Sequence, residues 1–255
     1  MAGISAIGSS DNIYGQIASG RRINSAADDA SGLAISQKME KEIGGLTQGG
    51  ENASEGVNAL NIADGAMGQI TDSLQRVYEL SVKAANTFMY GDEEISAMQD
   101  EASRLLEGVS QLVQGTNYNE KNLLGGENPD MHIASNPNGS GQDIEMVNAS
   151  LAAIGMDNFD ISSSDAIKQV SDALTKISGG RASLGAASVS LEYAKNYSAV
   201  AAENTLASKS RLEDLDIPKA VSEKEKKRLL QDYQTALLKK QQEDKERQKI
   251  GLFQF

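Results

Sequence analysis

The hydrophobic residues between Leu60 and Leu80 recur in steps of three and four positions. They are Leu60, Ala63, Met67, Ile70, Leu74 and Val77. This spacing places them in one narrow seam along an α-helix, with charged and polar residues on the opposite face. A lone helix cannot bury such a seam, so the stretch predicts partner helices with the same periodicity.

Two further stretches carry matching seams. One holds Ile95, Met98, Ala102, Leu105, Val109 and Leu112, and the other holds Ile167, Val170, Leu174, Ile177, Leu184 and Leu191. We expect one helix over about residues 30–85, one capped by Asp92 and ending near Gly115, and one capped by Ser162 and ending near Arg211. Together they predict a mainly α fold, a long antiparallel helical bundle or coiled coil.

Two features interrupt this helical pattern. Gly44-Gly45 and Gly49-Gly50 lie inside the first predicted helix, where each glycine costs about 1 kcal/mol relative to alanine. They indicate either a bend or tight packing against another backbone. Over residues 131–147, apolar and polar residues alternate on both sides of the turn-rich NPNGSG, which predicts a small β-hairpin.

Helix boundaries are marked at both ends of the chain. Asn24 or Ser25 can cap a helix whose first turn holds Asp28 and Asp29, and this capping interpretation is favoured over a metal site because no third ligand lies nearby. Asp216 and Pro218 mark a break, after which a last helix is expected to about residue 249.

Composition and charge narrow the classes of partner. The chain has 255 residues, with 24 Lys and Arg against 36 Asp and Glu, a net charge of −12. An acidic surface argues against nucleic acid and against membranes as partners. No run of apolar residues approaches the length of a membrane-spanning helix, and the N-terminus lacks the pattern of a secretory signal. Cysteine is absent, which excludes disulfides and thiol chemistry.

The residues needed for common catalytic sites are also missing. His132 is the single histidine, so neither a histidine-based triad nor a multi-histidine metal site can be assembled. The glycine-rich GLTQGG lies within a helical pattern rather than after a strand, which argues against a phosphate-binding loop. We therefore expect no enzyme activity, no metal and no cofactor.

One helix face carries a candidate binding site. Arg76 and Leu80 are four residues apart and hence neighbours, Glu79 lies beside them, and Glu101 lies next to the second seam. Leu80 lies just outside the strict seam, which would continue at Ser81. Two interpretations stay open: a widened core stripe, or an exposed leucine beside an arginine in a binding surface for a partner.

Several ordered segments resemble bacterial flagellins. They are SGRRINSAADDASGLAI, GLTQGGENASEGVNALNIADGAMGQITDSLQRVYELSVKAAN, QDEASRLLEGVSQLVQGTNYNEKNLL, ISGGRASLGAASVSLEYAKNY and SRLEDLDIPKAV. The resemblance implies that residues 1–32 and 214–255 form a small terminal domain with its two chain ends paired as helices. Residues 33–213 would form the helical rod domain that carries the hairpin.

The same resemblance implies function and partners. It implies a structural subunit that assembles with itself into the flagellar filament, exported by the flagellar secretion apparatus to the cell exterior without a cleaved signal peptide. An export chaperone and the hook-associated and cap proteins are further implied partners. QRVYEL looks like the family's QRVREL, which places contacts of Toll-like receptor 5 on Arg76, Leu80 and Glu101, whereas Tyr78 departs from the usual arginine.

Two segments differ from the family's usual pattern. Only about twenty residues precede SGRRINSA, and the last helix carries KKQQEDKERQK instead of a segment rich in Ala, Gln and Leu. Both segments form the inner tube of the filament in the family. An alternative function is therefore a flagellin-like protein of the hook–filament junction, or a variant that does not polymerise and acts as a binding protein.

Overall fold

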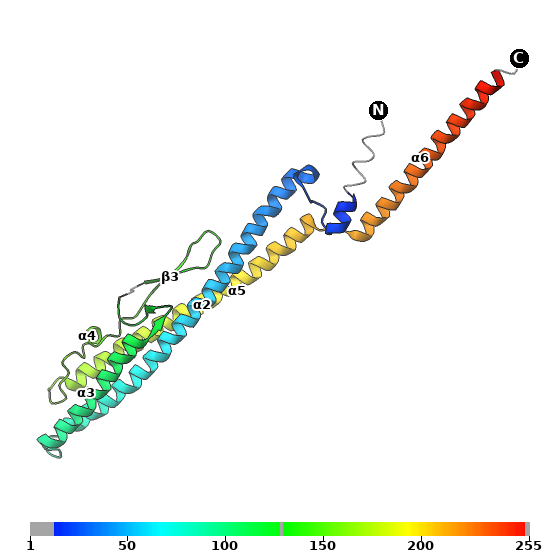
Figure 1. Ribbon diagram of the computed structural model, residues 1–255. Helices are drawn as coiled ribbons and strands as arrows, with labels where there is room; N and C mark the ends of the chain where they lie inside the picture. Colours follow the sequence, from blue (N-terminus) through cyan, green and yellow to red (C-terminus); the bar gives the residue numbers. More distant parts are fainter. Residues whose placement is uncertain (1–12, 128–129, 253–255) are drawn as a thin grey trace. The chain divides into compact units, whose positions relative to one another are not determined.

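The computed structural model describes residues 13–127 and 130–252, and it is mainly helical (Figure 1). Residues 13–19 form a short helix. The elements after it are α2 (Ala26–Ala84), α3 (Asp92–Gly115), β1 (Asn117–Tyr118), β2 (Lys121–Asn122), β3 (Asp130–Ala134), β4 (Gly141–Glu145), α4 (Leu151–Ile154), α5 (Ala166–Glu213) and α6 (Ile217–Leu252). The predicted fold class is confirmed.

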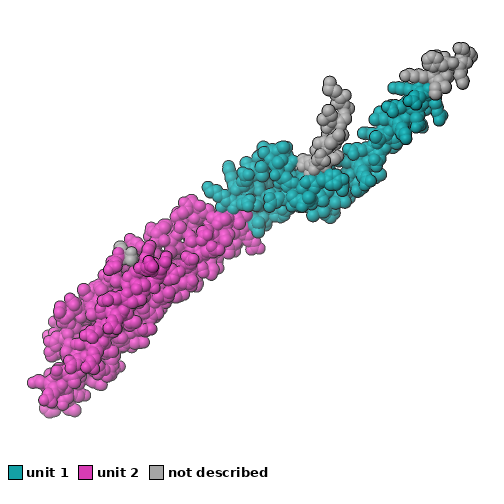
Figure 2. Space-filling model, in the orientation of Figure 1, with its two compact units in different colours: residues 1–41, 204–255 teal, residues 42–203 magenta. Residues whose placement is uncertain are grey.

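The chain divides into two compact units (Figure 2). Unit 2 comprises residues 42–203, and unit 1 comprises residues 1–41 and 204–255. The rod domain expected over residues 33–213 extends beyond unit 2 at both ends, and its boundaries stay a prediction.

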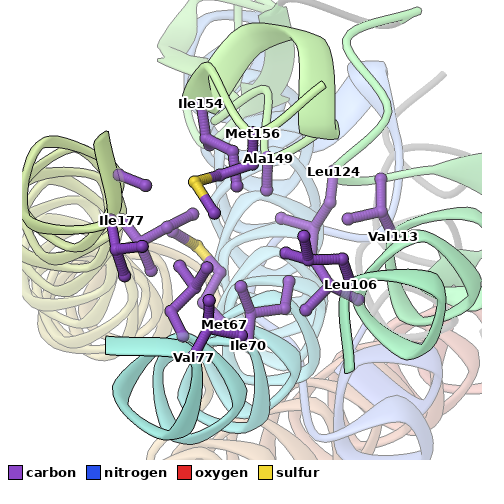
Figure 3. Packing of buried hydrophobic residues seen from close by; sticks show 14 of the residues in the cluster. Met67, Ile70, Val77, Leu106, Val113, Leu124, Ala149, Ile154, Met156 and Ile177 are labelled. Atoms are coloured by element: carbon purple, nitrogen blue, oxygen red, sulfur yellow. The ribbon is translucent and has the colours of Figure 1, made fainter. Parts of the chain in front are cut away.

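The core of unit 2 forms where α2, α3 and α5 face one another. All six residues of the predicted α2 seam are at most 1% exposed, which confirms that seam. Met67, Ile70 and Val77 of α2 point toward Leu106 of α3 and Ile177 of α5 (Figure 3). The side chains of Ala149, Ile154 and Met156 close the cluster from the segment around α4.

The buried face of α3 is rotated from the predicted seam. The helix buries Ala102, Leu106, Val109 and Val113, whereas Leu105 and Leu112 are only half-buried. The cause lies in the irregular chain that follows α4, because the side chain of Gln99 donates to the carbonyl of Phe159 at 3.0 Å and accepts from the N–H of Ile161 at 2.7 Å. A helix with two neighbours buries a wider stripe than a coiled-coil seam.

The predicted hairpin is confirmed, and it explains the glycines of α2. β3 and β4 pair antiparallel with Met131 opposite Ile144. A Cβ atom at Gly49 would lie 2.2 Å from the carbonyl oxygen of Ser135, and one at Gly45 would lie 2.6 Å from the Cβ of Pro137. Of the two interpretations, tight packing against another backbone is therefore correct, and α2 continues through both glycine pairs.

The start of α2 confirms the capping interpretation. The carboxylate of Asp28 accepts hydrogen bonds from the N–H groups of Asn24 and Ser25 at 3.0 and 2.9 Å. Asp29 has an extended backbone (φ −162°), and its carboxylate accepts from the N–H of Gly32 at 2.8 Å. Asp28 and Asp29 therefore satisfy N–H groups at two successive helix starts, as side chains at helix N-termini commonly do.

Two other predicted caps are wrong by a few residues. The residue that precedes α3 is Gly91 rather than Asp92, and its N–H donates to Glu94 at 3.0 Å. α5 begins at Ala166, and the hydroxyl of Ser162 instead donates to Asp160 at 2.6 Å. In both turns an acidic side chain, Glu94 or Asp160, accepts the local hydrogen bond. Residue preferences at helix starts alone had assigned the cap to Asp92 and Ser162.

Unit 1 brings the two ends of the chain together. The N–H of Leu215 donates to the carbonyl of Gly20 at 2.9 Å, at the break between α5 and α6 that the sequence predicts. The ring of Tyr14, in the short helix over residues 13–19, lies 4.3 Å from the Nζ of Lys224 in α6. Residues 1–12, the rest of the expected N-terminal part, lie outside the described residues.

Candidate functional site

The predicted surface on α2 and α3 is centred on the side chain of Arg76. Its Nη2 lies 2.7 Å from Oε1 of Glu101 on α3, and its Nη1 lies 3.1 Å from Oε2 of Glu79 on α2. The three side chains are 42–62% exposed. The hydrogen bonds to Glu101 and then Glu79 raise the pKa of Arg76. The structure therefore brings three of the four predicted residues together, as one solvated ionic cluster.

Leu80 does not belong to that exposed cluster. Its side chain is 2% exposed, and the neighbouring Ser81 is also buried, with its hydroxyl donating to the carbonyl of Val77 at 2.8 Å. The expectation of an exposed leucine is wrong, and the widened core stripe is the correct interpretation. The stripe is broader here because α3 covers this end of α2.

A second ionic contact joins α2 to α5 and was not foreseen from the sequence. The Nε and Nη2 of Arg181 lie 2.8 and 3.2 Å from the two carboxylate oxygens of Asp64. The hydrogen bond from Arg181 lowers the pKa of Asp64 despite partial burial. The signal was an acidic residue on α2 opposite a basic one on α5, which becomes visible only when the antiparallel register of the two helices is known.

Exposed apolar side chains also follow one face of α5 within unit 2. They are Val189, Tyr193, Tyr197 and Val200, spaced by four, four and three residues and 50–72% exposed. This spacing keeps all four on one side of the helix. The spacing of these four residues is visible in the sequence. The prediction for this helix used only its buried seam, which includes Leu184 and Leu191.

Metal-binding groups and membrane-spanning helices are both missing from the described residues. Over residues 13–127 and 130–252, no group of three His, Asp or Glu side chains could hold a metal ion. His132 lies in the hairpin with its Nδ1 2.5 Å from Asp143, and the hydrogen bonds to Asp143 and then to the carbonyl of Gly139 raise the pKa of His132. Within the same described part, no helix is both long and apolar enough to span a bilayer.

Comparisons with known proteins agree with this arrangement of helices. Residues 8–129 match the bacterial flagellin N-terminal helical region, and residues 167–250 match the C-terminal helical region. The flagellin of Bacillus subtilis (strain 168) is 33% identical over 88% of this chain and 86% of its own length. Flagellin FlaB1 of Treponema pallidum is 34% identical over 88% of this chain and 85% of its own.

The chain belongs to the bacterial flagellin family. This family is structural rather than enzymatic. The crystal structure of Bacillus cereus flagellin superimposes with a TM-score of 0.51 at 20% identity, and it covers 58% of this chain and 88% of its own. That likeness concerns the fold alone.

Proposed function

We propose that this flagellin is a structural subunit of the bacterial flagellar filament, located outside the cell and exported by the flagellar secretion apparatus without a cleaved signal peptide. The observation that carries the proposal is the match of both terminal helical regions of the family, on either side of a short hairpin segment. An export chaperone and the hook-associated and cap proteins would be its partners before and during assembly.

The exposed face of α5 supports self-association. Tyr193 and Tyr197 are 72% and 66% exposed, with Val189 and Val200 on the same side. Apolar surface of this kind, continuous along a helix, is typical of protein–protein contacts. Repeated contacts between different faces of identical subunits generate open helical filaments.

Seeded polymerisation tests the proposal. Purified monomer is mixed with sonicated filament fragments, sedimented, and examined by electron microscopy. We expect long helical filaments that grow from the seeds. A monomer that stays in the supernatant at high concentration with seeds present would contradict the proposal and favour the alternative, a junction protein or a binding protein that does not polymerise. The charged sequence of α6 is the observation that favours this alternative.

We further propose that unit 2 is a ligand of Toll-like receptor 5, with Arg76, Glu79 and Glu101 as the contact residues. Arginine is common among residues that dominate binding energy, and this one is exposed and held in place by two carboxylates. Leu80 is buried beneath this surface. It would contribute to receptor binding indirectly, by packing α2 against α3.

Receptor affinity of single variants tests this second proposal. Arg76→Ala should weaken binding of the monomer to the receptor ectodomain by more than about 1 kcal/mol. Arg104→Ala is the matched control, since Arg104 is exposed on α3 outside the cluster, and it should leave the affinity within about 0.5 kcal/mol. If Arg76→Ala and the unmodified protein bind the receptor with equal affinity, the cluster is not part of the receptor-binding site.

A further inference from the structure

The turn of the hairpin contains the single Asn-Gly pair of the sequence, Asn138-Gly139. Together with Asn136 and Pro137 it forms a β-turn, in which the N–H of Gly139 donates to the carbonyl of Asn136 at 3.0 Å. Asparagine at the first position, proline at the second and glycine at the fourth are residues that such a turn favours. All four residues are exposed, so solvent reaches the Asn-Gly pair.

An asparagine that precedes a glycine can react with its own backbone. The backbone nitrogen of the glycine attacks Cγ of the asparagine side chain and closes a five-membered ring. Glycine has no Cβ to hinder this attack, and it adopts backbone conformations that other residues avoid. Negative charge develops on the side-chain oxygen Oδ1 as the ring closes, so hydrogen-bond donors already aimed at that oxygen lower the barrier.

Ser140 supplies two such donors in the hairpin turn. Its N–H and its hydroxyl lie 3.0 and 2.7 Å from Oδ1 of Asn138. Gly139 has a φ of +83°, and nothing lies within 4 Å of the position that a Cβ would occupy there. The turn therefore combines a polarised side-chain carbonyl with open space beside the attacking nitrogen.

Asn148 has a similar side-chain contact but a different backbone environment. It is also exposed, and its Oδ1 accepts from the N–H of Ser150 at 3.0 Å. The residue after it is Ala149, which is 0% exposed and whose N–H donates to the carbonyl of Leu124 at 2.9 Å. The nitrogen that would have to attack is therefore held in the core, whereas that of Gly139 lies in an exposed turn.

We propose that Asn138 is a site of spontaneous deamidation. Hydroxide takes the proton from the backbone nitrogen of Gly139, the new N–Cγ bond forms, and the Cγ–Nδ2 bond breaks. The leaving amide nitrogen takes a proton from water and departs as ammonia, which regenerates hydroxide. Water then adds to one of the two ring carbonyls and opens the ring. The product at position 138 is aspartate, or isoaspartate with the backbone running through the former side-chain carbonyl carbon.

Isoaspartate would disturb a turn that is anchored on both sides. The carbonyl oxygen of Ser135 faces Gly49 of α2 and accepts from the hydroxyl of Ser198 at 3.4 Å. Ala134 pairs with Gly141 across the two strands. Isoaspartate lengthens the backbone by one atom between these fixed points, so strand pairing beside the turn should loosen. Aspartate keeps the backbone length and should leave the pairing intact. The reaction needs no partner, so it is independent of filament formation.

Mass spectrometry of the full chain tests the site. The folded protein is incubated in mildly alkaline buffer, and samples are digested with trypsin at weakly acidic pH, where the reaction is slow. The tryptic peptide 122–168 holds both Asn138 and Asn148 and is sequenced by fragmentation. Asn138 should convert at least about tenfold faster than Asn148, and its rate should rise with pH. Equal rates at the two positions, or an unchanged Asn138, would overturn the proposal.

Two further comparisons test the part played by the turn. Ser140→Ala should slow conversion of Asn138 by about threefold or more, because one of the two donors to Oδ1 is lost. A rate equal to that of the unmodified chain would remove the hydroxyl of Ser140 from the reaction. Unfolding in urea should raise the rate at Asn148 by a larger factor than at Asn138, since folding restrains the nitrogen beside Asn148. An Asn138 that reacts only in urea would mean that the native turn protects it, and the proposal would be wrong.

Hydrogen exchange tests the effect on the hairpin. The isoaspartate form, separated chromatographically, is compared with Asn138→Asp, which has the same charge and a regular backbone. Amide protons of β3 and β4 should exchange about threefold or more faster in the isoaspartate form, because opening of the strand pair costs less free energy. Equal exchange in the two forms would show that the hairpin absorbs the extra atom and would overturn the predicted loosening.

Discussion

At the scale of single residues, Leu80 shows what periodicity determines and what it does not. Steps of three and four predict every member of the α2 seam, because those residues face the helix bundle on any reasonable packing. Leu80 lies at the edge of that stripe, and its burial depends on where α3 lies. The width of a buried stripe is a property of the neighbouring helix, so it cannot be predicted from one helix alone.

We predict that Leu80→Ala destabilises the protein by about 2–5 kcal/mol, because it removes a fully buried side chain and leaves a cavity. Val82→Ala is the control, since Val82 is 47% exposed and its truncation should cost less than about 0.5 kcal/mol. Chemical denaturation followed by circular dichroism measures both. Similar stability of the two variants would place Leu80 at the surface.

The Asp64–Arg181 contact gives a prediction with a pH dependence. Asp64→Asn should cost about 1 kcal/mol or less at neutral pH, because both side chains are 39–44% exposed and solvent screens the pair. Arg181 lowers the pKa of folded Asp64, so the contribution is complete above the unfolded carboxyl value of about 3.9. It is then lost as the pH falls through the folded pKa.

The measurement is the difference in unfolding free energy between the unmodified protein and Asp64→Asn, taken from neutral pH down to pH values near the carboxyl range. The difference should shrink toward acid. Asp100→Asn, an exposed control on α3, should show no comparable trend. A difference that grows as the pH falls would mean that Arg181 does not stabilise the charged form of Asp64.

At the scale of elements, the hairpin was predictable and its docking was not. Alternation of apolar and polar residues around NPNGSG gives two short strands. The glycines of α2 indicated that another backbone approaches this helix closely. The sequence did not identify the hairpin as that backbone, because Gly49 and Ser135 are far apart in the chain. The side-chain amide of Asn52, which donates to the carbonyl of Ala134 at 2.8 Å, completes this contact.

We predict opposite effects for two glycine substitutions in the same helix. Gly49→Ala should destabilise unit 2 by about 1–3 kcal/mol, because its Cβ would meet the backbone of Ser135 at 2.2 Å and the hairpin must shift. Gly44→Ala meets nothing within 4 Å and should stabilise the helix by about 0.5–1 kcal/mol. Thermal unfolding measures both, and equal shifts would exclude the contact with the hairpin.

At the scale of the whole molecule, the chain ends were the least predictable part. The break before α6 follows from Asp216 and Pro218, and the N–H of Lys219 indeed donates to the carboxylate of Asp216 at 3.1 Å. The buried carboxylate of Glu213 could not be foreseen. It is 5% exposed and accepts from the hydroxyl of Ser36 at 2.7 Å, a contact between positions 177 residues apart. Such long-range polar contacts leave no periodic signal.

Limited trypsin digestion tests where the rod domain ends. Lys38, Lys41, Lys209 and Arg211 lie inside the predicted boundaries of 33–213 but outside unit 2. The Nζ of Lys209 lies 3.0 Å from Glu40 and 3.8 Å from the buried Glu213, so we expect these four sites to resist trypsin.

The basic residues between Glu225 and Arg247 of α6 should be cut first, because every side chain in this segment is exposed, and such a helical segment opens locally at low free energy. Mass spectrometry of the early fragments then decides between two boundaries. A protected fragment that retains Lys41 and Lys209 supports the predicted rod boundaries of 33–213. If those two sites are cut as fast as the sites in α6, the rod is confined to residues 42–203. The contacts of Glu213 would then be too weak to protect the chain beyond these boundaries.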